Sequence, residues 1–110
     1  MNCAELGTAM QAGLYPIVLI VNNASYGTIR MHQERNYPHR VLGTDLQNPD
    51  FVGLAKSYGF YGERVELTDQ FAAAFDRALQ SKTGAILDLV VATEAITPRQ
   101  SIADLRTART

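Results

Sequence analysis

The sequence predicts an α/β protein with three layers, α/β/α, built on a mostly parallel sheet. Two mainly apolar runs, residues 17–22 and 85–91, are typical of strands in the middle of such a sheet. Segments with helical spacing separate them, and this alternation is typical of parallel sheets joined by right-handed crossovers. We therefore expect the 17–22 strand to be buried on both of its faces.

The first half of the chain predicts helix, strand and helix. Apolar residues at helical spacing indicate an amphipathic helix over residues 2–12, with Cys3 as a small buried side chain. The strand 17–22 follows, and a short helix is expected over 27–34. Residues 35–47 carry proline, glycine and asparagine, so they are expected to form an irregular loop.

The middle of the chain predicts a helix followed by a short strand. Asn48 is expected to cap this helix, with Pro49 at its first position, because both residue types are preferred there. Gly59 ends the helix, and residues 60–65 predict the strand.

The last third predicts a helix, a strand and a tail. Thr68 is expected to cap the helix, and Gly84 leads into the apolar strand 85–91. In the tail, Ser101 and Asp104 have the spacing of a capping box, which predicts a short helix.

Composition excludes several classes of function. The 110-residue chain is 46% hydrophobic and 19% charged, with a net charge of −1, which is typical of a globular domain. It has no basic run, so we expect no nucleic-acid partner. Its apolar runs are far shorter than the ~20 residues that cross a membrane, so we expect no membrane partner. A single cysteine fits a reducing cytoplasm.

The candidate site lies where the strand 17–22 ends. Asn22 and Asn23 close the strand and are followed by Ala24, Ser25 and Tyr26. In open parallel sheets, ligands bind outside the carboxyl ends of the strands. The two amides offer neutral oxygen ligands and hydrogen-bond donors at that place. An Asn-Asn pair after a strand, taken alone, is more often a simple turn or helix cap.

This segment resembles the pyrophosphate-binding domain of thiamine diphosphate enzymes, most closely the acetolactate synthase and 2-oxo acid decarboxylase group. The resemblance rests on Glu5-Leu6-Gly7-Thr8-Ala9, the 18-residue step from Glu5 to Asn23, Tyr26-Gly27, Asn48-Pro49-Asp50-Phe51 and Glu94-Ala95-Ile96-Thr97-Pro98. The family's Gly-Asp-Gly would fall before residue 1. The resemblance therefore implies an N-terminally truncated domain over residues 1–94 that lacks its first strand, with a tail over 95–110.

The resemblance also implies a cofactor and a metal. In the family Mg²⁺ holds the diphosphate of the cofactor, and a hard cation of this kind prefers oxygen ligands. By this resemblance Asn23 supplies an amide oxygen and Ser25 a backbone carbonyl to the metal. Asn22 is expected to brace either the turn or the diphosphate.

Further residues are assigned by the same resemblance. Tyr26, Gly27 and Thr28 are expected to lie along the cofactor. Ile29 and His32, about one helical turn apart, are expected to face the substrate side, although an exposed structural role is the more common one for such a histidine. Arg30, Glu34 and Arg35 are expected to form a solvated face or to pair with a neighbouring domain.

The function implied is that of the C-terminal cofactor-binding part of an enzyme acting on 2-oxo acids, by carboligation or decarboxylation. The glutamate that activates the cofactor comes, in the family, from the pyrimidine-binding domain of a partner subunit. We therefore expect a homo-oligomer, and no activity from this chain alone. The alternative is a non-catalytic remnant or interaction module. A generic nucleotide-binding module is disfavoured, because no Gly-x-Gly-x-x-Gly or Walker-type loop is present.

Overall fold

A computed structural model describes residues 2–108; the ends of the predicted 1–94 and 95–110 segments, residues 1 and 109–110, lie outside the described residues. The chain forms two compact units. Unit 1 comprises Met1–Val21 and Pro49–Val90, and unit 2 comprises Asn22–Asn48 and Val91–Thr110. Between residues 2 and 108, no helix combines the length and the apolar character that crossing a bilayer requires.

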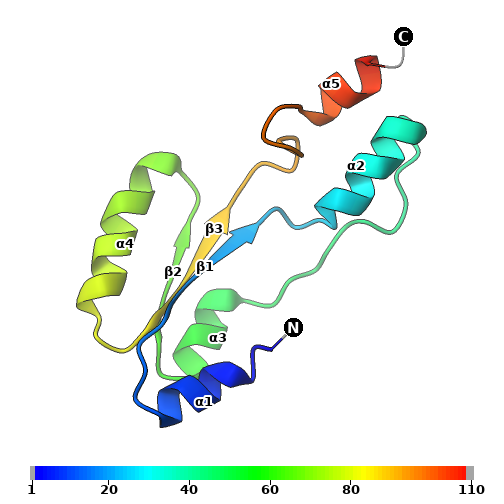
Figure 1. The fold of residues 1–110 in the computed structure, drawn as a ribbon. Helices are drawn as coiled ribbons and strands as arrows, with labels where there is room; N and C mark the ends of the chain where they lie inside the picture. Colours follow the sequence, from blue (N-terminus) through cyan, green and yellow to red (C-terminus); the bar gives the residue numbers. More distant parts are fainter. Residues whose placement is uncertain (1, 109–110) are drawn as a thin grey trace. The chain divides into compact units, whose positions relative to one another are not determined.

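The helices and strands follow the predicted order (Figure 1). In chain order the elements are α1 (Glu5–Gln11), β1 (Ile17–Asn22), α2 (Gly27–Asn36), α3 (Phe51–Ser57), β2 (Tyr61–Val65), the 3-10 turn η1 (Thr68–Gln70), α4 (Phe71–Gln80), β3 (Ala85–Val90) and α5 (Ile102–Thr107). The short helix predicted in the tail is α5. Its capping box is confirmed, because Ser101 Oγ accepts from Asp104 N and the Asp104 carboxylate accepts from Ser101 N.

The sheet of unit 1 has the order β1-β3-β2. β2 and β3 are parallel, with Tyr61 opposite Ala85 and Val65 opposite Leu89. The start of β3 is joined to the start of β1, since Ala85 N donates to Pro16 O at 2.8 Å. The three strands point the same way (Figure 1), which confirms the predicted parallel sheet.

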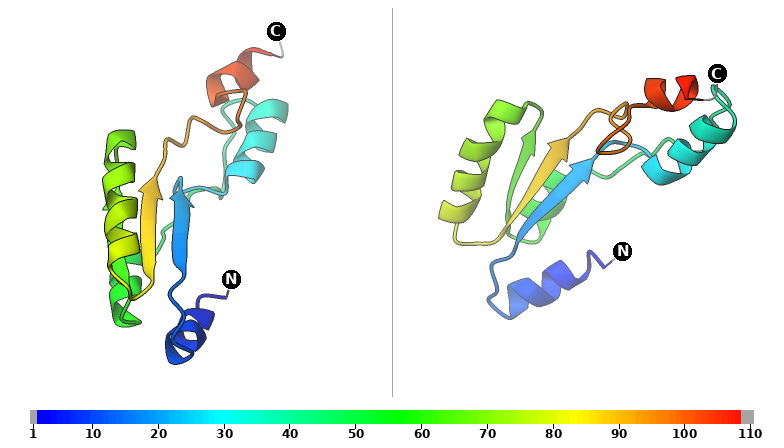
Figure 2. Two further views of the ribbon diagram at one scale, coloured as in Figure 1. Left: turned by 60° about the vertical axis from the view of Figure 1, so that its left-hand side comes forward. Right: turned by 45° about the horizontal axis from the view of Figure 1, so that its top comes forward.

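Helices cover the two faces of this sheet, which confirms the three-layer prediction (Figure 2). On one face α4 packs with Ala74 and Ala78 against strand residues that include Ala85 and Leu87. On the other face Ile86 packs with residues of α3 and α1, including Ala55, Leu6 and Ala9. The alternation of β3 side chains between these clusters follows from the two-residue period of a strand.

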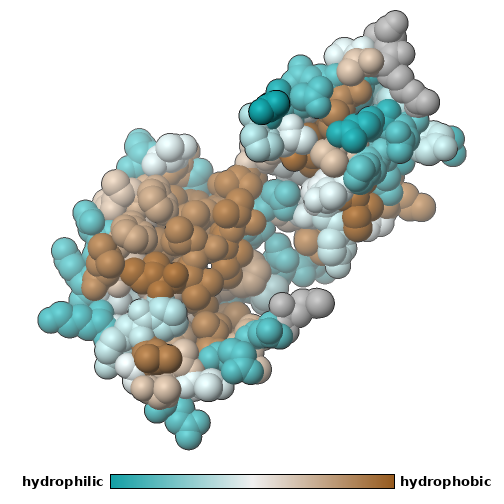
Figure 3. Space-filling view, viewed as in Figure 1, coloured by the Kyte–Doolittle hydropathy of each residue, from teal (hydrophilic) through white to brown (hydrophobic). Residues whose placement is uncertain are grey.

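The prediction that strand 17–22 is buried on both faces is wrong. Leu19 and Val21 are 44% and 68% exposed, whereas Val18 and Ile20 pack toward α1 and α3. The reason is the strand order: β1 is an edge strand, and α4 contacts β2 and β3. A space-filling view shows apolar residues gathered on the face of unit 1 where the strands lie beside α4 (Figure 3).

Two predicted caps are also wrong. Asp50, not Asn48, caps α3: its Oδ1 accepts from Val52 N at 3.1 Å and from Gly53 N at 3.0 Å. Thr68 is the first residue of η1 and not its cap. The side-chain oxygen of Gln70 instead accepts hydrogen bonds from the backbone N–H groups of Glu66 and Leu67. In both cases a nearby polar side chain reaches the free backbone N–H groups more directly.

The amino-terminal helix is shorter and less buried than predicted. α1 begins at Glu5, where no side chain caps it, and none of its residues is fully buried. Cys3 is exposed, so the prediction of a buried cysteine is wrong. Only the side of the helix that carries Leu6 and Ala9 packs against the sheet.

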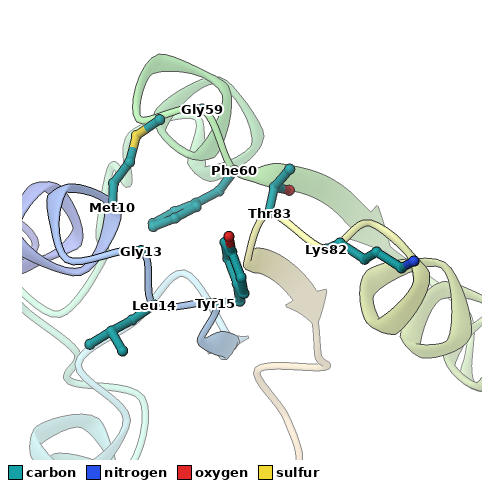
Figure 4. Close-up of a pocket in the computed structure, with 8 residues that line it drawn as sticks. All are labelled: Met10, Gly13, Leu14, Tyr15, Gly59, Phe60, Lys82 and Thr83. Carbon is teal, nitrogen blue, oxygen red and sulfur yellow. The ribbon is translucent and has the colours of Figure 1, made fainter.

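Unit 1 also has a hollow of about 280 Å³ at the amino ends of its strands (Figure 4). Tyr15, Phe60 and Thr83 line it, and each lies one or two residues before a strand. The rings of Tyr15 and Phe60 lie at the hollow, and the Lys82 side chain extends away from them (Figure 4). Ligands of open parallel sheets bind at the opposite, carboxyl ends of the strands, so this hollow is not the favoured site.

Candidate cofactor site

The candidate site is the turn between β1 and α2, in unit 2. Asn22 Oδ1 accepts from Ala24 N at 3.1 Å, and Asn23 Oδ1 accepts from Ser25 N at 3.1 Å. Ala24 has a φ of +52°, which is unusual for a residue other than glycine and which turns the chain sharply here. The two asparagine side chains thus shape the turn that follows the strand.

Distant segments of unit 2 also hold this turn. Asn48 Nδ2 donates to Asn22 Oδ1 at 2.9 Å, so the residue expected to cap α3 braces the turn instead. Thr93 Oγ1 donates to Asn23 O at 2.9 Å. These bonds fix the backbone before α2 without using the second acceptor position of the Asn23 amide oxygen.

The backbone carbonyls of residues 22–26 are almost all occupied. Those of Asn22, Asn23, Ala24 and Tyr26 accept from Val91 N, Thr93 Oγ1, Leu46 N and Arg30 N, respectively. Among residues 2–108, no donor reaches the carbonyl oxygen of Ser25, although Ser25 is only 6% exposed. Buried carbonyls are nearly always paired, so this oxygen is available to a ligand.

The start of α2 adds donors to the site. No side chain caps this helix, whose backbone N–H groups of the first turn therefore have no cap partner. Five consecutive residues at this point, Ser25, Tyr26, Gly27, Thr28 and Ile29, line a hollow of about 320 Å³. Free N–H groups at a helix start are suited to phosphate oxygens, because the helix dipole favours negative charge there.

The absence of a side chain at Gly27 makes room for Asn23. A Cβ at residue 27 would lie 2.9 Å from Asn23 Nδ2, closer than a real contact allows. The Asn23 amide therefore keeps its orientation only if residue 27 is glycine.

We predict that Gly27→Ala lowers Mg²⁺-dependent affinity for thiamine diphosphate roughly tenfold, the scale seen when a metal ligand loses its orientation. Thermal stability is expected to stay the same or rise, because alanine is the better helix former. Calorimetric titration measures the affinity, and Gly7→Ala in α1 is the matched control. Equal affinity in both variants would contradict the role given to Gly27.

The structure brings most of the predicted site residues together. Asn22 and Asn23 form the turn, and the five residues from Ser25 to Ile29 line the adjoining hollow. His32 does not line it and is exposed. Its place on the substrate side stays a prediction.

An ion pair in unit 2 went unrecognised in the sequence. Glu34, expected on a solvated face, is completely buried and accepts from Arg106 Nε at 2.8 Å and Nη2 at 2.6 Å. Arg30 lies 3.9 Å from the same carboxylate, and His39 N donates to it at 3.1 Å. The Arg106 hydrogen bonds, against the opposing effect of burial, lower the pKa of Glu34 from 4.5 to about 2.

The residues at the turn fit a magnesium ion that is held mainly by a ligand's phosphates. Within residues 2–108 no cluster of three or more His, Cys, Asp or Glu side chains could hold a metal. The turn offers two neutral oxygens, Asn23 Oδ1 and Ser25 O. Mg²⁺ commonly takes few protein ligands and completes its shell with phosphate oxygens and water.

Sequence comparison decides the family. The family described as thiamine pyrophosphate enzyme, C-terminal TPP binding domain, matches residues 1–89. The chain belongs to this family. This confirms the resemblance drawn from the helix, the strand and the Asn-Asn turn.

Curated relatives of the chain include acetolactate synthase subunits. The acetolactate synthase large subunit of Parasynechococcus marenigrum is 39% identical over 93 residues, which is 83% of this chain and 15% of that protein. The mitochondrial acetolactate synthase catalytic subunit of Saccharomyces cerevisiae is 34% identical over 91 residues, 83% of this chain and 13% of that protein. The matched part of the chain thus covers about one seventh of the length of these relatives.

Solved structures share the fold. A thiamine diphosphate-dependent 4-hydroxybenzoylformate decarboxylase from Rhodococcus jostii matches with a TM-score of 0.72 at 27% identity, over 83% of this chain and 17% of that one. A benzoylformate decarboxylase from Polynucleobacter necessarius matches with a TM-score of 0.72 at 26% identity, over 84% of this chain and 18% of that one.

Proposed function

We propose that residues 22–29 bind the diphosphate of thiamine diphosphate through Mg²⁺, with Asn23 Oδ1 and Ser25 O as metal ligands. The observation that carries this proposal is the carbonyl of Ser25, the one carbonyl of residues 22–26 that accepts no hydrogen bond within residues 2–108. It belongs to the residue whose N–H donates to Asn23 Oδ1, so both oxygens come from one short turn.

The remaining site residues have distinct roles in this proposal. Asn22 holds the turn through its bonds to Ala24 and Asn48. The N–H groups at the start of α2, around Gly27 and Thr28, face the diphosphate. Tyr26 and Ile29 border the hollow and exclude water from one side of the cofactor.

The whole protein is proposed to act on 2-oxo acids, in the manner of acetolactate synthases and related decarboxylases. The bound cofactor supplies an electron sink for cleaving or forming the bond next to a carbonyl. We also propose that a second polypeptide segment, a pyrimidine-binding domain of a partner subunit, completes the site in a homo-oligomer; the matched part of this chain covers 15% and 13% of two acetolactate synthase relatives. We propose the cytoplasm as its location, and no turnover of pyruvate by this chain alone.

We predict that this 110-residue chain binds thiamine diphosphate only with Mg²⁺, and more weakly than a full-length acetolactate synthase does, because the proposed protein ligands are neutral. The substitution Asn23→Ala is expected to weaken the Mg²⁺-dependent affinity for thiamine diphosphate at least tenfold. Gln80→Ala removes an exposed amide from α4 and is the control. Calorimetry with both ligands measures the affinities.

Two results would count against the proposal. A folded chain that binds no cofactor at any Mg²⁺ concentration favours the alternative of a non-catalytic remnant or interaction module. Unchanged affinity in Asn23→Ala means that the metal ligands lie elsewhere.

A further inference from the structure

The peptide group that joins Asn23 to Ala24 is held at both of its ends. Its N–H donates to Asn22 Oδ1 at 3.1 Å, and its carbonyl accepts from Thr93 Oγ1 at 2.9 Å. Directly after this peptide group, Ala24 has a φ of +52°, a left-handed conformation that residues other than glycine rarely adopt. Such a residue keeps its conformation only where the surrounding structure fixes it, so these two bonds set the direction of the chain into the turn.

A distant loop holds the rest of the turn through backbone groups. The sequence predicted only an irregular loop over 35–47, but this loop forms an antiparallel bridge in which Asp45 lies opposite Ser25. Two backbone hydrogen bonds, of 2.9 and 2.8 Å, flank this pair. Because these bonds join backbone groups, they do not depend on which side chains the loop carries. Thr93 differs, since it holds the turn with its side chain.

Thr93 lies in the segment that follows β3, beyond the residues 1–89 that match the family. Its hydroxyl is the donor in the bond to Asn23, because a carbonyl oxygen can only accept. The same segment reaches the start of α2 at a second point. A Cβ at residue 27 would lie 3.7 Å from Ile96 Cδ1, so Ile96 packs on the open side of Gly27 that Asn23 Nδ2 also contacts.

We propose that Thr93 is a positioning residue of the metal site, whose hydroxyl fixes the Asn23 carbonyl and thereby the directions of Asn23 Oδ1 and Ser25 O. This inference rests on the proposed function. Thr93 acts through Asn23, as the hydrogen-bond partners of other metal ligands orient those ligands. Without the hydroxyl, the Asn23 carbonyl loses its donor, and the peptide group before the left-handed Ala24 is held at one end only.

The test compares Thr93→Val, which keeps the shape of the side chain but removes the hydroxyl, with Thr93→Ser, which keeps the hydroxyl. Mg²⁺ is titrated calorimetrically into this chain at fixed thiamine diphosphate. Thr93→Val is expected to raise the apparent Kd for Mg²⁺ roughly tenfold, the lower end for an outer-shell partner, and Thr93→Ser should retain most of the affinity. Thr107→Val is the control, because it removes a hydroxyl that donates to the Ala103 carbonyl within α5. Its Kd should be unchanged.

Hydrogen exchange of the ligand-free chain gives a readout that does not depend on the cofactor. The Ala24 amide belongs to the peptide group that Thr93 holds. It should therefore exchange faster in Thr93→Val and close to the wild-type rate in Thr93→Ser. Faster exchange throughout unit 2 in Thr93→Val would mean that the whole unit is loosened, and the inference would fall.

The binding results separate this inference from the proposed function. If Asn23→Ala loses affinity and Thr93→Val does not, the role of Thr93 is wrong and the proposed function stands. If Thr93→Ser is as weak as Thr93→Val, or if Thr93→Val fails to fold, Thr93 is structural and the inference falls. If the wild-type chain binds no Mg²⁺ with the cofactor, both fall.

Discussion

Replacing Arg106 by leucine is expected to release α5 from α2. While α5 stays packed, Glu34 would remain buried without the guanidinium that donates to both of its oxygens. Removing Arg106 leaves the buried carboxylate with only Arg30, 3.9 Å away, and the His39 N–H as partners, so we expect amide hydrogens of α2 and α5 to exchange roughly a hundredfold faster. Hydrogen exchange followed by NMR or mass spectrometry measures this.

Two variants make the test specific. Arg99→Leu removes an exposed arginine from the same tail and should leave exchange unchanged. The double variant Glu34→Leu with Arg106→Leu removes both charges, and an apolar pair can replace a buried ion pair without loss. Exchange in the double variant should therefore return toward that of the wild type. Equal loss in the single and double variants would show that burial of charge is not the cause.

The same pair makes unit 2 sensitive to acid. The pKa of Glu34 falls from 4.5 to about 2 in the folded state, so the unfolded state binds more protons between these values. The stabilisation is complete above the unfolded pKa and is lost as the pH falls from about 5 toward 2. Glu34→Gln should reduce this acid dependence.

The second large effect expected is self-association through β1. This edge strand carries no charged residue between Ile17 and Val21, whereas the other edge strand, β2, carries Glu63 and Arg64. An uncharged strand edge with unpaired backbone groups favours pairing with another chain. We therefore expect light scattering to give a mass of at least a dimer that rises with concentration.

Val21→Lys should shift this equilibrium to the monomer. Val21 is 68% exposed, so lysine costs little packing while placing a charge at the strand edge. Leu79→Lys introduces the same charge at an exposed position of α4, where Leu79 is 55% exposed, and should leave the mass unchanged. A wild-type chain that is monomeric at high concentration would disprove the prediction.

Local chemistry allowed much of the fold to be predicted. The strand ending at Asn22 is an apolar run in which every residue from Ile17 to Val21 except Leu19 is β-branched, and the Ser101–Asp104 spacing predicted the cap that α5 shows. The Asn22-Asn23 turn could also be placed, because it directly follows a strand of a parallel sheet. Such features depend on neighbours in the sequence, so the sequence by itself determined them.

Tertiary structure alone decided the remaining features, because they depend on residues far apart in the chain. The burial of Glu34 follows from Arg106, 72 positions away, and no helical pattern around Glu34 signals that partner. Leu19 and Val21 are exposed because β1 is an edge strand and α4 contacts β2 and β3. Backbone hydrogen bonds pair Asp45 with Ser25 and so join the loop to the turn. Nearly every residue type can make such bonds, so the pattern of side chains in the sequence does not predict this pairing.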